Sequence, residues 1–344
     1  MNATLTVDLD AFAANLARMR ERVAPAELML VVKDDAYGHG LERIVSRAHD
    51  AGVRWIGAFD VASGVRVRAV LGDDARVFAW MVSGIGDARA AVDATLDLGI
   101  GDPAALEEVA EAARLAGRSA RVHLKIDTGL HRNGVRPEEW PEFVARAVHL
   151  ERAGRIEVVG IWSHIAEASD DDDDASREQF LAAIAAAEQQ GVRAPVRHLA
   201  ASAAAFARAE FRFDLVRVGA FCYGIRPAGG PSDADLGIAP VASLDAPVVS
   251  VHPDGVRVGI GSADGVPSTL GGRIDVVTPG GDRLVRRIDD LETTVDPWPG
   301  AAVGQSIRIY GVGTAGPTDL AEKIDTIGEE IALRLSPLIE RRYR

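Results

Sequence analysis

Short hydrophobic runs alternate with amphipathic segments from residue 8 to about residue 225. Most of these runs are rich in β-branched residues and are bounded by Gly, Asp or Ser, a pattern that predicts β-strands. The predicted strands are Leu28–Val32, Trp55–Ala58, Val77–Trp80, Asp97–Ile100, Val122–Ile126, Val158–Trp162, Val196–His198 and Leu215–Val218.

The segments between these strands are rich in Ala and Arg and predict helices that return the chain to a parallel neighbouring strand. Eight such units favour a closed (β/α)₈ barrel of the TIM type, with an open doubly wound sheet as the alternative. The predicted helices are Leu41–Ala51, Val61–Val70, Ala88–Ala94, Pro103–Leu115, Glu138–Glu151, Ala175–Gln190 and Ser202–Ala209.

The pattern changes after residue 228, where Gly, Pro, Val and Asp dominate and turn sequences such as Pro253-Asp254-Gly255 recur. Such short strands between turns predict an antiparallel all-β domain. We therefore expect an N-terminal barrel over residues 1–228 and a C-terminal all-β domain over residues 229–344. Examples of the predicted strands of this second domain are Ala246–Val251, Val256–Ile260, Arg273–Val277 and Ser306–Tyr310.

Composition narrows the function classes. The 344 residues carry a net charge of −13, which argues against a nucleic-acid partner because no basic excess is present to displace counterions. Charges interrupt every apolar run, so no membrane span is expected, and the N-terminus lacks a signal-peptide pattern. These features predict a soluble cytoplasmic protein. The run Asp170–Asp174 is interpreted as a solvated acidic loop, with a calcium site as the alternative.

Candidate chemistry gathers where the predicted strands end, which is where barrel enzymes build their sites. Lys33 directly follows the first strand, and Tyr37, His39 and two carboxylates come within the next six residues. Burial beside such groups would lower the pKa of the amine enough for Schiff-base chemistry. The alternative is a lysine that extends from the strand end into solvent.

The later strands add basic residues to the same end. Lys125 lies inside the fifth strand, so its charge must be buried or paired, with Asp127 as a candidate partner. Arg132 follows a Gly-containing turn and can present its planar fork to a carboxylate. His164 and His198 follow or end the sixth and seventh strands. Taken singly, either histidine is more typical of a structural position.

The last two strands lead into a candidate phosphate site. Ser202 follows the seventh strand, Gly219 and Ala220 follow the eighth, and loops at these positions hold phosphate in many barrels. A hydroxyl with free backbone N–H groups suits a phosphate without needing positive charge. A lysine on the first strand with a phosphate site opposite describes pyridoxal phosphate better than a sugar phosphate.

These residues carry a family resemblance. The segment Val32–Gly40 resembles the cofactor-lysine motif of alanine racemases, with Asp34 where that family usually has alanine. Further family blocks are similar, in the same order, to Lys125–Gly134, Ser163-His164, His198–Ala204 and Val216–Gly224. The resemblance implies a pyridoxal-phosphate-dependent amino-acid racemase that acts on a small amino acid. It also implies a homodimer in which the β domain completes the neighbour's site.

The resemblance further implies individual roles. Lys33 would bind the cofactor covalently and act as base on the D-amino-acid face, Arg132 would meet the substrate carboxylate, and Arg217 would bond the pyridine nitrogen. Lys125 occupies a position that is often carbamylated in the family. No metal ligand is implied. The residues implied to bind the cofactor are Lys33, Tyr37, His164, His198, Ser202, Arg217, Gly219 and Ala220, and those implied to be catalytic are Lys33, Arg132 and His164.

The second domain departs from the family pattern. Alanine racemases use a tyrosine from the partner's β domain as the second base, in a loop that is absent here because Val251–Gly255 runs directly into Val256–Gly265. Ser262 stands where the family often has a tyrosine, Asp289–Glu292 matches a substrate-pocket block only loosely, and the tyrosine that caps the phosphate is replaced near Pro337. Three functions stay open: a racemase or epimerase, a one-base lyase, and a non-catalytic protein that binds pyridoxal phosphate.

Overall fold

The computed structural model describes residues 2–167, 169–194 and 196–344. It divides into two compact units. The barrel unit comprises Met19–Lys33 and Leu41–Gly219, and the β unit comprises Met1–Arg18, Asp34–Gly40 and Ala220–Arg344. The N-terminal residues and a short segment after Lys33 therefore group with the C-terminal part of the chain.

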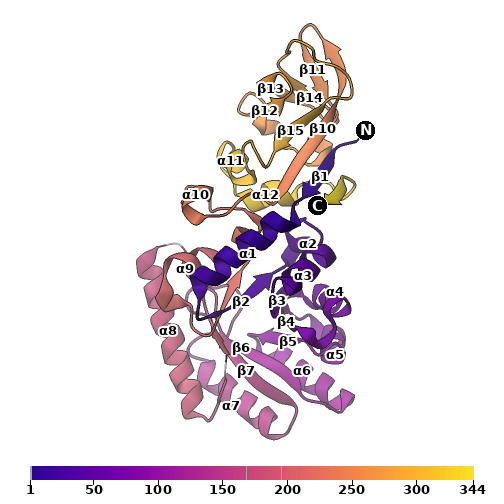
Figure 1. The fold of residues 1–344 in the computed structure, drawn as a ribbon. Helices are drawn as coiled ribbons and strands as arrows, with labels where there is room; N and C mark the ends of the chain where they lie inside the picture. The colour runs from indigo at the N-terminus through magenta and orange to yellow at the C-terminus, as the bar shows by residue number, and fades with distance from the viewer. Residues whose placement is uncertain (1, 168, 195) are drawn as a thin grey trace. The chain divides into compact units, whose positions relative to one another are not determined.

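The barrel unit is built on eight parallel strands in the order β8-β7-β6-β5-β4-β3-β2-β9 (Figure 1). The ends of this sheet meet, because Asp214 N–H donates to the Arg197 carbonyl at 3.2 Å and Arg217 N–H to the Ala200 carbonyl at 3.1 Å. The eight predicted strands and the closed barrel are confirmed. The strands are β2 (Glu27–Val31), β3 (Trp55–Asp60), β4 (Arg76–Met81), β5 (Asp97–Ile100), β6 (Ala120–Lys125), β7 (Ile156–Trp162), β8 (Val196–His198) and β9 (Leu215–Val218).

Helices α3 to α8 lie on the outside of these strands (Figure 1). Their ends follow local chemistry: in α6 the Asp102 carboxylate accepts the N–H of Ala105, Pro103 begins the helix, and Gly117 ends it in the left-handed region at φ 65°. Helix α1 (Leu9–Val23) was not predicted. The others are α3 (Leu41–Asp50), α4 (Val61–Leu71), α5 (Gly84–Asp93), α6 (Pro103–Ala116), α7 (Trp140–Arg152), α8 (Asp170–Gln189) and α9 (Ser202–Ala207).

The acidic run belongs to a helix. Helix α8 begins at Asp170, and the Ser169 hydroxyl accepts the N–H of Asp172 as its N-cap. Carboxylates in a first helical turn are stabilised by the positive end of the helix dipole. The predicted acidic loop is therefore wrong. No group of three or more His, Cys, Asp or Glu residues suited to a metal ion occurs in the described ranges.

The β unit contains a sheet with the strand order β11-β14-β13-β12-β15-β10-β1-β16. All its pairings are antiparallel except that of β1 with β16. The predicted β domain is confirmed, whereas β1, β13, β14 and β16 were not predicted. The strands are β1 (Thr4–Val7), β10 (Ala242–His252), β11 (Gly255–Val258), β12 (Asp275–Thr278), β13 (Gly281–Ile288), β14 (Thr293–Val295), β15 (Ser306–Tyr310) and β16 (Glu340–Tyr343).

The β unit also contains the short helices α10 (Asp233–Leu236), α11 (Pro317–Glu322) and α12 (Gly328–Leu333). None of the helices in the described part of the chain is long and apolar enough to cross a membrane.

Candidate active site

Lys33 is followed by an uncommon backbone conformation. The helix α2 (Lys33–Tyr37) contains Asp34, Asp35, Ala36 and Tyr37 with φ between 53° and 56°, which is the left-handed region. This conformation costs non-glycine residues about 1–2 kcal/mol each, so surrounding interactions must maintain it. Within the turn, the N–H of Gly38 donates to the Asp34 carbonyl at 2.9 Å. Backbone strain of this kind is concentrated at functional sites.

Arg217 on β9 is held in one orientation by the barrel. Its side chain is buried, and its Nη1 lies 2.9 Å from Nδ1 of His198. Its Nη2 donates to the carbonyls of Ser163 and Leu199, each at 2.7 Å, and lies 3.2 Å from Nδ1 of His164. Burial lowers the pKa of Arg217 to about 9, so the guanidinium is still protonated at neutral pH. The structure thus brings together Arg217, His164 and His198.

His164 lies in a positively charged environment. Burial, together with the charges of Arg217 and Arg132, lowers its pKa to about 3. Lys125 and Lys33 contribute further in the same direction. The imidazole is therefore neutral at physiological pH and can accept a hydrogen bond through the nitrogen that faces Arg217.

Lys125 is buried at the end of β6. Its Nζ donates to the Arg132 carbonyl at 3.2 Å and lies 4.6 Å from the centre of the Trp162 ring. Burial and the charge of Arg217 lower its pKa to about 8. Asp127, the partner suggested by the sequence, instead accepts the N–H groups of Gly129 and His131 and contacts the His131 ring. Its influence on Lys125 is electrostatic, without a direct ion pair.

Of the candidate phosphate residues, Ser202 and Gly219 belong to the barrel unit, and Tyr37 and Ala220 belong to the β unit. In the barrel unit the N–H of Gly219 donates to the Ser202 hydroxyl at 3.1 Å. In the β unit Tyr37 is buried, its ring centre 4.7 Å from that of Tyr223. Burial raises the pKa of Tyr37, opposed by a backbone hydrogen bond from Ala220. The phenol is thus neutral at physiological pH.

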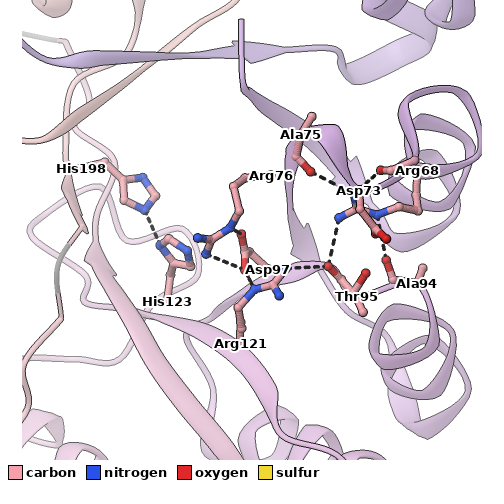
Figure 2. Close-up of polar contacts among 11 residues, drawn as sticks. Arg68, Asp73, Ala75, Arg76, Ala94, Thr95, Asp97, Arg121, His123 and His198 are labelled. Atoms are coloured by element: carbon pink, nitrogen blue, oxygen red, sulfur yellow. Dashed lines mark hydrogen bonds and ion pairs between the residues drawn. The ribbon is translucent and has the colours of Figure 1, made fainter. Parts of the chain in front are cut away.

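Two polar side chains in this region were missed by the sequence analysis. Glu167 accepts the N–H of Ala204 at 3.0 Å, and burial raises its pKa. His123 lies inside the barrel, where its Nδ1 is 2.9 Å from Nε2 of His198 (Figure 2). A histidine in the middle of the apolar strand Val122–Ile126 is the signal that could have pointed to it.

The β unit confirms that the hairpin of β10 and β11 is short. His252 and Gly255 are paired in register, so only Pro253 and Asp254 connect the strands. Ser262 lies close to the segment after β13: its hydroxyl donates to the Asp290 carboxylate at 3.2 Å, and its N–H donates to the Asp289 carbonyl at 2.8 Å.

The fold and these side chains define a barrel enzyme with lysine, arginine and imidazole groups at the carboxyl ends of its strands. The family model described as "Alanine racemase, N-terminal domain" matches residues 7–227. The alanine racemase of Beutenbergia cavernae is 39% identical, with 98% of this chain and 97% of that protein covered. The alanine racemase of Streptomyces coelicolor is 37% identical, with 100% and 96% covered.

Solved structures agree with this relationship. The alanine racemase from Streptomyces coelicolor A3(2) superimposes with a TM-score of 0.96 at 35% identity, covering 99% of this chain and 98% of that one. The enzyme from D-cycloserine-producing Streptomyces lavendulae gives a TM-score of 0.95 at 34% identity, covering 100% and 97%. The chain belongs to the alanine racemase family.

Proposed function

We propose that this protein is a pyridoxal-phosphate-dependent amino-acid isomerase of the alanine racemase type, acting on a small amino acid. The observation that carries the proposal is the guanidinium of Arg217, buried and oriented at the same end of one barrel as Lys33, Arg132 and Ser202. Membership of the alanine racemase family supports the reaction class.

The chemistry of the side chains fits this cofactor. A phosphate needs several donors, and the Ser202 hydroxyl and Gly219 N–H already lie within hydrogen-bond distance of each other. Lys33 supplies the amine that the cofactor aldehyde requires. When bound, pyridoxal phosphate supplies an electron-withdrawing ring that stabilises negative charge on the substrate α-carbon.

Each of these side chains has its own role in the proposed reaction. Lys33 takes and returns the α-proton on one face of the substrate. Arg132 binds the substrate carboxylate through its planar fork. Arg217, which can only donate, would hold the ring nitrogen of a bound cofactor unprotonated. The ring would then withdraw negative charge less strongly, which would favour return of the proton to the α-carbon. His164 and His198 hold Arg217 in place.

The second base is the point at which this chain differs. The two-residue turn between His252 and Gly255 leaves no room for a loop with a tyrosine. Gaps in this chain are also required by its alignments with relatives, which extend over 367 and 381 residues against its own 344. This observation favours a second candidate function, a one-base lyase in which cleavage replaces proton return on the opposite face.

We also propose that two copies of the chain associate in the cytoplasm, with the β unit of one copy facing the site of the other. Large apolar side chains at the surface of the β unit support such a contact. Leu291 is 69% exposed and Val303 67% exposed, and their burial in a contact between two copies would be favourable.

The covalent attachment of the cofactor tests the proposal directly. Full-length protein supplied with pyridoxal phosphate is reduced with borohydride, digested, and mapped by mass spectrometry. We expect the label on Lys33 alone and its loss in Lys33→Ala. A label confined to any other lysine would contradict the site, and no label in either protein would contradict the proposed cofactor.

A further inference from the structure

Three polar side chains form a continuous line inside the barrel, which we call the imidazole relay. Arg217 on β9, His198 at the end of β8 and His123 on β6 are joined by two nitrogen-to-nitrogen contacts of 2.9 Å. Figure 2 shows the two imidazoles directed at each other. Both histidines are fully buried, so no solvent competes for these contacts.

The contacts determine where each ring proton lies. A guanidinium has donors only, so Nδ1 of His198 must accept from Arg217. The proton of neutral His198 is then on Nε2, which must donate to Nδ1 of His123. Burial lowers the pKa of His198 and lowers that of His123 to about 4, so both rings are neutral. Without Arg217, either histidine could donate the hydrogen bond to the other. The contact with Arg217 makes His198 the donor and His123 the acceptor.

The far end of the relay is unpartnered. His123 must carry its proton on Nε2, and that atom is buried without a hydrogen-bond partner. The ring is held instead by packing, with its centre 4.9 Å from Phe78 and 5.9 Å from Trp55. Gly160 makes room for it, because a Cβ at that position would lie 2.0 Å from Nδ1 of His123.

An unpartnered buried N–H is unfavourable, and an aliphatic side chain would avoid it. The acceptor nitrogen of His123 is the feature that an aliphatic residue could not replace. We propose that His123 is a positioning residue: its Nδ1 accepts from Nε2 of His198 and so holds that ring where its Nδ1 accepts from Arg217, which fixes the guanidinium. The last step, the action of that guanidinium on the cofactor, rests on the proposed function.

The tautomers can be observed directly. In full-length protein supplied with pyridoxal phosphate and ¹⁵N-labelled at histidine, long-range ¹H–¹⁵N spectra separate protonated from unprotonated ring nitrogens. We expect Nε2 protonated and Nδ1 unprotonated in both residues, with a scalar coupling between Nε2 of His198 and Nδ1 of His123. A proton on Nδ1 of either ring would overturn the relay, and this measurement needs no variant to fold.

Two substitutions test the consequence. His123→Asn keeps an acceptor oxygen at the place of Nδ1, whereas His123→Leu removes it. We expect His123→Leu to lower kcat for α-proton exchange about tenfold with little change in KM, and His123→Asn to restore most of the loss. Phe78→Leu, which alters packing against both rings without a hydrogen bond, is the matched control and should leave the His198 tautomer unchanged.

The outcomes separate the two proposals. If His123→Leu keeps both the wild-type His198 tautomer and the wild-type kcat, His123 is a packing residue and the relay is wrong. If the tautomers are as described but borohydride does not label Lys33, the proposed function fails while the positioning of Arg217 by His123 stands. If Lys33 is labelled but the ring protons lie elsewhere, only the relay fails.

Discussion

Nη1 of Arg217 lies 2.9 Å from Nδ1 of His198, and both side chains are buried inside the barrel. The second amino group of Arg217 is occupied by the carbonyls of Ser163 and Leu199. Burial of a charge is unfavourable unless it is hydrogen-bonded, and both terminal nitrogens of this guanidinium have partners. The arrangement gives Arg217 little rotational freedom, which suits the role proposed for it beside the ring nitrogen of the cofactor.

Replacing Arg217 with glutamate tests this arrangement. A carboxyl group at this position would allow the ring nitrogen to be protonated, so we expect the ratio of transamination to proton return to rise by at least about tenfold. The ratio is measured as pyridoxamine phosphate formed per turnover with D-alanine. Arg197→Gln, which removes a half-exposed pair with Asp214 just before β9, is the control and should leave the ratio unchanged. An unchanged ratio in Arg217→Glu would place the ring nitrogen elsewhere.

Lys125 should make folding stability depend on pH. Its pKa is about 8 in the folded protein and about 10.5 when unfolded, so between these values the unfolded chain binds the extra proton. The free energy of unfolding should therefore rise with pH across this window, by about 3 kcal/mol relative to Lys125→Met. Urea denaturation of both proteins from about pH 7 to about pH 10 measures the difference. Parallel curves would show that the amine is not desolvated.

The neutral form of Lys125 also bears on its predicted carbamylation. Only an unprotonated amine reacts with carbon dioxide, and a pKa of about 8 leaves a substantial neutral fraction near that pH. After incubation with ¹³C-bicarbonate we expect a carbamate carbonyl signal that is absent in Lys125→Met. The same signal in both proteins would assign it to another amine.

Asp97 should be important for stability rather than activity. Its buried carboxylate accepts from Arg76 at 2.6 Å and also binds Arg121 (Figure 2). Asp97→Asn leaves both arginines without their counter-charge, and we expect the free energy of unfolding to fall by about 3 kcal/mol. Glu107→Gln breaks an exposed pair with Arg146 and should cost less than about 1 kcal/mol. Equal losses in the two variants, measured by urea denaturation, would refute this ranking.

The short hairpin predicts one-sided proton chemistry. In D₂O, Lys33 should exchange the α-hydrogen of D-amino acids much faster than that of L-amino acids, because no matched base serves the opposite face. Loss of an acid–base partner lowers a proton-transfer rate about 10³-fold. We therefore expect this ratio between the exchange rates of the D- and L-isomers, measured by NMR. Cleavage products in the same samples would favour the lyase.

His252 provides the control for this prediction. It is exposed at the end of β10, with its Nε2 3.0 Å from the Ser250 hydroxyl. If exchange is two-sided, His252→Gln should abolish exchange of the L-isomer and spare the D-isomer. Two-sided exchange that survives this substitution would mean that another residue replaces the family's tyrosine.

The barrel could be predicted because its signals are local. Most of the eight strands from β2 to β9 contain a short apolar run, and an amphipathic helical segment follows most of them along the chain. The carboxyl ends of parallel strands meet at one end of a closed barrel, so the order of the motifs was enough to bring Lys33, Arg132, His164 and Arg217 into one list. The short hairpin could also be predicted from the sequence, because the residues of Pro253-Asp254-Gly255 strongly favour a turn.

Other features depend on contacts between distant parts of the chain. Thr4–Val7 becomes a strand because it pairs with Ala242–Asp245 on one side and with Glu340–Tyr343 on the other. A segment of four residues is too short for its hydrophobic pattern to predict a strand. The left-handed turn after Lys33 is unfavourable for its own residues, so local propensity predicts against it. The run Asp170–Asp174 resembles a loop until Ser169 caps the helix that contains it.

The imidazole relay shows most clearly which features the sequence determines and which depend on the tertiary structure. Sequence alone determined that His123, His198 and Arg217 lie on three different barrel strands. The closure of the barrel decided that the three side chains meet in its interior, because parallel strands direct alternate residues inward. The guanidinium can only donate hydrogen bonds, whereas each imidazole can donate or accept. Their contact in the folded protein therefore determines which ring nitrogens of His198 and His123 carry protons.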